Sequence, residues 1–207
     1  MYAKSLKLLV VPLSNYSRDL YYTETMLPWV PPSPNLPTYE SAIVYTAMVL
    51  LEGINISVGR GTAKPFEYIG ATWIEPVAFC DGLRGLALEA FRFMPVYFKP
   101  TFSKYERMRC GGVQIFYAGG RFSPTEISYK VIRYLRVNYS RKFRWERFGE
   151  KYDIDYLVGT DKFRKAIELG KSWEEFEREI TEGIEKFNEM RQNYLLYEGE
   201  YTISPGR

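Results

Sequence analysis

The feature that limits the fold most is a proline-rich segment between residues 28 and 37. Prolines stand at positions 28, 31, 32, 34 and 37. Proline fixes the backbone φ angle and lacks an N–H donor, so neither a helix nor a central strand can run through this segment. We therefore expect the chain to divide here, into a connecting part over residues 1–37 and a folded domain over residues 38–207.

A short apolar run, Leu-Lys-Leu-Leu-Val-Val-Pro, occupies residues 6–12 before the break. A run of this length predicts a strand buried on both faces, as in a parallel or mixed sheet. No partner strand lies near it in the sequence, because an irregular stretch over residues 13–37 follows. This orphan strand needs partners from elsewhere.

Residues 38–207 alternate between helical and strand patterns. Thr38 is a helix N-cap residue that follows Pro37, and Ser172 with Glu175 matches a capping box. The expected helices cover 38–52, 75–86, 124–139, two short pieces within 155–170 and a long helix from 172, and the expected strands lie within 65–74, 91–98 and 112–117. The predicted fold class is α+β, with a small mixed β-sheet covered by helices and a helical C-terminal part.

Several kinds of chemistry are excluded by composition. Histidine is absent, which removes Ser-His-Asp catalysis and His-ligated zinc. For Cys80 and Cys110, the two cysteines, we expect buried thiols, with one disulfide as the alternative. The acidic residues lack the spacing of a calcium loop. We therefore expect neither a metal nor a cofactor.

Charge and hydropathy indicate an ordinary globular chain, with a net charge of +3 and 46% hydrophobic residues. No apolar run approaches the roughly 18 residues of a membrane span, and no signal-peptide cleavage pattern follows the start. We expect no membrane span and a cytoplasmic location. Glutamine occurs only at positions 114 and 192, a scarcity that hints at a thermophile.

A glycine loop carries the candidate polar chemistry. Arg60 lies between Gly59 and Gly61, so the backbone can approach a ligand while the guanidinium binds a carboxylate or phosphate. Glu52 precedes this loop and Glu67 follows it, as candidates for a pair of catalytic carboxylates. The alternative is structural, with Arg60 forming an ion pair with one of the two glutamates.

Residues 133–147 combine basic and aromatic side chains, which is typical of single-strand nucleic-acid binding. The alternative is a solvated helix face beside the acidic last helix. No nucleic-acid module motif is present, so nucleic acid is an unlikely partner.

Two segments resemble a known family. They are Trp-Val-Pro-Pro-Ser-Pro-Asn-Leu-Pro at 29–37 and Leu-Glu-Gly-Ile-Asn-Ile-Ser-Val-Gly-Arg-Gly-Thr-Ala-Lys-Pro-Phe-Glu-Tyr-Ile-Gly-Ala-Thr-Trp at 51–73. Further agreement lies at 97–104, 110–115, 157–161 and 194–197. The chain resembles the C-terminal half of the NamZ-type exo-β-N-acetylmuramidases, a family long described as a domain of unknown function.

The resemblance implies a missing part. In that family a Rossmann-like N-terminal domain precedes this half, and the presumed active site lies in the cleft between them. Residues 6–12 then look like the last strand of the missing sheet. The implied function is the auxiliary, cleft-forming part of a glycoside hydrolase that releases N-acetylmuramic acid from peptidoglycan fragments. The implied partners are a Rossmann-like domain on a separate chain and a glycan.

The resemblance also implies the site residues. Glu52 is the candidate general acid/base, and Arg60 or Arg18 would bind the lactyl carboxylate of muramic acid. Trp29 would stack on a sugar ring. The polar residues expected to contact the glycan are Asn35, Asn55, Thr62, Ser103, Lys104 and Gln114.

The sequence departs from the family pattern at three positions. Val58 stands where a glutamate is usual, and Tyr105 and Phe116 stand where histidine is common. A non-catalytic module that binds a glycan or another protein is therefore the alternative function. A homo-oligomer is a further possibility.

Overall fold

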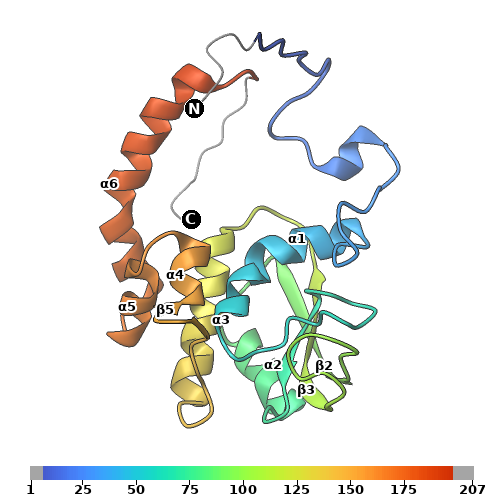
Figure 1. Cartoon of the computed structure of the whole chain (residues 1–207), viewed down its shortest axis with the longest axis vertical. Coiled ribbons are helices and arrows are strands. Elements are labelled where there is room, and N and C mark those ends of the chain that lie inside the picture. The colour runs from blue at the N-terminus through green and yellow to red at the C-terminus, as the bar shows by residue number, and fades with distance from the viewer. Residues whose placement is uncertain (1–6, 198–207) are drawn as a thin grey trace.

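The computed structural model describes residues 7–197, which form a three-stranded sheet, a separate two-stranded sheet, several helices and an extended N-terminal segment (Figure 1). The sheet has three strands in the order β1-β3-β2, formed by β1 (Tyr68–Ala71), β2 (Phe91–Phe98) and β3 (Cys110–Tyr117). Both strand pairs are antiparallel. The α+β class is confirmed, but the sheet is antiparallel and not mixed, because β3 returns beside β2 as a hairpin and the apolar run before residue 13 does not join it.

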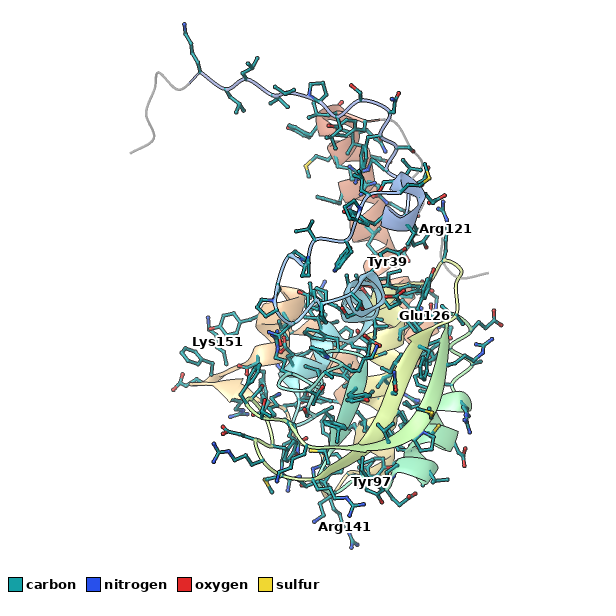
Figure 2. All side chains as sticks on the ribbon, turned by 90° about the vertical axis from the view of Figure 1, so that its right-hand side faces the viewer. Tyr39, Tyr97, Arg121, Glu126, Arg141 and Lys151 are labelled. Carbon is teal, nitrogen blue, oxygen red and sulfur yellow. The ribbon has the colours of Figure 1, made fainter. Side chains whose placement is uncertain are left out.

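Two helices pack against this sheet, and a third helix packs against them. They are α1 (Tyr39–Met48), α2 (Pro76–Arg84) and α3 (Pro124–Asn138). Thr38 caps α1 as expected, accepting a hydrogen bond from the Ser41 N–H. On β3, Val113 and Ile115 are fully buried in the core. Side chains alternate along a strand, so the intervening positions of β3 point to the opposite face, which lies toward the viewer in Figure 2.

The C-terminal part is helical, as expected. It comprises the short strands β4 (Arg147–Phe148) and β5 (Lys151–Tyr152), then α4 (Asp153–Val158), α5 (Lys162–Glu168) and α6 (Trp173–Arg191). The capping box at Ser172 and Glu175 starts α6. Trp173 and Phe176 pack against Tyr129 of α3, and the later turns of α6 extend past the body of the domain (Figure 1).

The described part of the N-terminal segment lacks the strand expected at residues 6–12. Residues 7–12 form no strand, and Leu9 is 86% exposed. A strand needs hydrogen-bonding neighbours, and this segment arches away from the sheet toward the end of α6 (Figure 1). There the Leu13 N–H donates to the Tyr197 hydroxyl at 2.7 Å. Residue 6, which the prediction included, lies outside the described residues.

Irregular structure continues through residue 37, interrupted by the 3₁₀ helix η1 (Tyr22–Thr25). Two other 3₁₀ helices are η2 (Val49–Gly53), which continues α1, and η3 (Gln192–Tyr194). Cys80 and Cys110 are buried free thiols, so the expected thiols are confirmed and the disulfide is not formed. Between residues 7 and 197, no helix is long and apolar enough to cross a membrane.

Candidate functional site

The Arg60–Glu52 pair is the central ion pair of the glycine loop. Arg60 donates from Nε to Glu52 Oε1 at 2.6 Å and from Nη2 to Glu52 Oε2 at 3.1 Å. The guanidinium also lies over the Phe66 ring at 4.9 Å. The bonds to Glu52 raise the pKa of Arg60 above its ordinary value. The structure thus places two predicted site residues in contact, in the geometry of the structural alternative.

Glu67 lies in a different environment from Glu52. Its side chain is almost fully buried, and one carboxylate oxygen accepts a hydrogen bond from Lys64 Nζ at 2.9 Å. Lys64 thereby neutralises Glu67, while Arg60 neutralises Glu52. Each carboxylate of the expected pair has its own cation.

The loop between β2 and β3, residues 99–109, holds the glycine loop in place. Thr101 donates to the Gly61 carbonyl through its backbone N–H at 2.8 Å and through its hydroxyl at 2.9 Å. Lys104 Nζ donates to the backbone carbonyls of Glu52, at 2.7 Å, and of Ile54. Burial lowers the pKa of Lys104. Lys104 therefore supports the backbone that carries Glu52.

Left-handed backbone is concentrated in this same loop. Ser103, Tyr105 and Arg107 have φ angles of +73°, +60° and +59°. For residues other than glycine, such φ angles raise the energy of the backbone. They persist where contacts with the surrounding structure hold the backbone in place. Here the Lys104 contacts and the Tyr105 hydroxyl, which donates to the Asn55 carbonyl at 2.9 Å, hold the loop.

A pocket of about 660 Å³ opens where the proline-rich segment, the glycine loop and the 99–109 loop meet. Its lining consists of Pro34, Asn35, Gly61, Thr62, Ala63, Pro65, Tyr68, Tyr97, Phe98, Lys99, Thr101 and Phe102. The Tyr68 and Phe98 rings stack with centroids 5.5 Å apart. Aromatic rings beside backbone and amide groups suit a ligand with both apolar and hydroxylated faces.

Three of the predicted residues belong to this pocket or border it. Asn35 and Thr62 are part of the lining. Gln114 stands directly opposite Tyr68 in the sheet register, so the two side chains are neighbours on the open face. Within the loop, the Thr62 hydroxyl donates to the Gly59 carbonyl at 2.6 Å.

Two other predicted residues, Asn55 and Trp29, do not line the pocket. Asn55 donates to the Lys142 carbonyl at 2.9 Å and accepts from the Arg144 N–H at 2.8 Å, so its amide connects two loops. Trp29 packs edge-on against Tyr22 and Tyr39. These contacts indicate a structural role for Asn55 and Trp29.

Arg18 and Ser103 complete the predicted set. Arg18 lies in the N-terminal segment and is not among the residues that line the pocket. Ser103 is exposed and follows Phe102, which does line it.

The three positions that depart from the family pattern have separate environments. Val58 is 4% exposed and belongs to the core, and the Tyr105 hydroxyl accepts from Trp73 Nε1 at 3.1 Å. Phe116 is 41% exposed, next but one to Gln114 on the open face of the sheet. The substitutions replace polar groups by a core side chain, a bridging hydroxyl and an exposed ring.

The pocket residues that sequence reasoning missed include four aromatic side chains. Tyr97, Phe98, Lys99 and Phe102 belong to a stretch that carried the family resemblance, Tyr-Phe-Lys-Pro-Thr-Phe-Ser-Lys at 97–104. That agreement was the available signal. Tyr68 had the same signal, because it lies in the family-like segment 51–73, but its place beside the pocket depends on the pairing of β1 with β3.

The basic and aromatic stretch at 133–147 does not form an open aromatic platform. Phe143 is buried, and Tyr134, Tyr139 and Trp145 pack against the hydrophobic core. Arg133 and Arg136 donate to backbone carbonyls of Gly170 and Ile167. Bases of single-stranded nucleic acid need exposed rings to stack on, and these rings are engaged inside the fold.

Fold and site together define an α+β domain with a ligand pocket beside an Arg–Glu pair. Comparison with family models then matches residues 43–197 to the C-terminal part of the exo-β-N-acetylmuramidase NamZ and residues 1–40 to the N-terminal part. The chain belongs to the NamZ family. Within the described residues, no group of three or more acidic or cysteine side chains is placed to hold a metal.

One curated relative is the peptidoglycan β-N-acetylmuramidase NamZ of Bacillus subtilis, 37% identical over 191 residues. The match covers 92% of this chain and 45% of the relative, so the chain spans about half the length of that protein.

Two solved structures of DUF1343 family proteins from Bacteroides fragilis are similar. One has a TM-score of 0.73 at 26% identity, and the match covers 88% of this chain and 49% of the solved chain. The other has a TM-score of 0.55 at 29% identity, with coverages of 82% and 44%.

Proposed function

We propose that this chain is the cleft-forming C-terminal part of an exo-acting β-N-acetylmuramidase that acts on peptidoglycan fragments in the cytoplasm. The observation that carries the proposal is the pocket, because the two segments that carry the family resemblance meet there. Pro34 and Asn35 come from one segment, and Gly61 and Thr62 come from the other. The name of the B. subtilis relative supports the substrate class.

A Rossmann-like domain on a separate chain completes the enzyme in this proposal. Residues 1–40 match the N-terminal family model, and the chain covers 45% of the relative. The apolar side chains of Leu8, Leu9 and Val11 are exposed on backbone without strand partners. Such a segment can add a strand to the edge of another sheet.

Glycoside hydrolysis needs a proton donor for the leaving oxygen and a carboxylate at the sugar. Glu52 supplies one carboxylate, and Arg60 orients it through two hydrogen bonds. The second carboxylate is assigned to the partner domain. Asn35, Thr62 and Gln114 supply groups that bind sugar hydroxyls.

The test is hydrolysis of a chromogenic N-acetylmuramide by this chain, by a protein carrying the family's N-terminal domain, and by their mixture. We expect turnover only in the mixture. Glu52→Gln in this chain should abolish most of that turnover, while Glu150→Gln, an exposed control, should not. Turnover that survives Glu52→Gln would remove Glu52 from the chemistry.

A second candidate, a non-catalytic glycan-binding module, is favoured by one observation. Both carboxylate oxygens of Glu52 already accept hydrogen bonds from Arg60, as in a structural ion pair. This function predicts that N-acetylmuramic acid binds without turnover in any mixture, and that binding persists in Glu52→Gln.

A further inference from the structure

We propose that the pocket selects a sugar bearing a carboxylate and that Lys99 binds this carboxylate. The inference rests on the proposed function and names the specificity-determining residue of its glycan site. Sequence reasoning assigned this task to Arg60 or Arg18. The charges around the pocket favour Lys99 instead.

The neighbouring cations are already engaged. Arg60 binds Glu52 and Lys64 binds Glu67, each within 3.0 Å. Lys104 is directed at the backbone carbonyls of Glu52 and Ile54. None of these ammonium or guanidinium groups is available to a ligand without giving up a hydrogen bond.

Lys99 differs from them. It is exposed and lines the pocket, and among residues 7–197 no carboxylate or carbonyl is paired with its ammonium group. The lining holds no aspartate or glutamate. The pocket therefore has one cation and no anion of its own, which attracts a negatively charged ligand.

A second cation, Arg109, adds positive charge beside the pocket-lining Tyr97. The Arg109 guanidinium lies 3.9 Å from the ring centroid of Tyr97, which is a lining residue. The rings of Tyr68 and Phe98 offer apolar surface beside these charges. An N-acetylated sugar with a lactyl carboxylate combines such surfaces, whereas N-acetylglucosamine lacks the charge.

The volume of about 660 Å³ leaves room for more than one sugar ring or for a substituent on the carboxylate side. A peptide attached through the lactyl group would convert that carboxylate to an amide and remove its charge. The pocket should therefore prefer the free acid over the same sugar carrying a neutral lactyl amide.

Calorimetric titration of the whole chain with three probes tests this inference: N-acetylmuramic acid, its methyl ester and N-acetylglucosamine. We expect the free acid to bind about fivefold more tightly than the other two at low salt, with the difference shrinking as salt is added. Lys99→Gln should reduce affinity for the acid to that of the ester. Lys162→Gln, an exposed lysine on α5, is the matched control and should leave all three affinities unchanged.

Equal binding of acid and ester by the wild-type chain overturns the inference, and so does a preference that survives Lys99→Gln. Absence of binding of all three sugars, with circular dichroism showing a folded chain, overturns it as well. Turnover in the two-protein mixture that is insensitive to Lys99→Gln retains the proposed function and rejects this inference. Binding that is selective for the acid, without turnover in the mixture, retains this inference and rejects the proposed hydrolase function.

Discussion

Replacing Gly61 by alanine should reveal how tightly the glycine loop and the 99–109 loop are joined. Gly61 has φ +79°, and an added Cβ would lie 2.6 Å from the Phe102 nitrogen and 2.9 Å from the Thr101 nitrogen. These are backbone atoms, which cannot rotate away. A left-handed alanine costs roughly 1–2 kcal/mol, and forced repacking adds about 1–3 kcal/mol. We expect Gly61→Ala to lower the unfolding free energy by about 2–5 kcal/mol.

Gly170 provides a matched control. Its φ of +78° is nearly the same, but a Cβ there meets nothing within 4 Å. Gly170→Ala should therefore show the backbone cost alone, about 1–2 kcal/mol. Urea denaturation of both variants measures the difference. If the two alanines destabilise the chain equally, the close approach of the loops at Gly61 is refuted, and with it the wall that they form in the pocket.

Three further predictions concern the pair, the core and the partner surface. A double-mutant cycle of Glu52→Gln and Arg60→Gln should give a coupling free energy of about 1 kcal/mol in urea denaturation, because both groups are mostly buried; additive effects would contradict the bidentate pair. Burial raises the pKa of Tyr129 to about 12, so the unfolded chain loses this proton first and stability falls as pH rises from about 10 toward 12. In urea denaturation at a series of pH values, Tyr129→Phe should reduce the loss of unfolding free energy between about pH 10 and 12. An unchanged loss would contradict the raised pKa of Tyr129. Leu9→Glu should weaken binding to the family's N-terminal domain in light scattering, whereas Phe148→Glu, at 80% exposure against 86%, should not; equal effects would reject the segment as a partner surface.

Local chemistry made much of the fold predictable. Thr38 and Ser172 cap their helices as expected, because an N-cap bond joins residues only three apart. Prolines 28–37 exclude helix and sheet through their own rings, and η1 lies before them. The α+β class followed from the same local patterns.

The N-terminal run marks the limit of such reasoning. Residues 7–12 have the composition of a strand but form none, because strand formation depends on a neighbour that supplies hydrogen bonds. Hydropathy records the tendency to be buried and not the identity of what buries it. The basic and aromatic stretch is a second case, since periodicity did not reveal that Phe143 faces the core.

The sequence predicted which residues belong to the candidate site, but it did not predict what each of them contacts. The types of Glu52, Arg60 and Lys104 suggested a polar site, and this information is present in the residue sequence. Their pairing depends on distances between segments up to 52 positions apart, such as the bond from Lys104 to the Glu52 carbonyl. Long-range packing of loops sets those distances, and it also leaves Lys99 as the pocket-lining cation without an anion among the described residues. Residue chemistry is thus a local property, whereas the partner of each charge is a property of the folded chain.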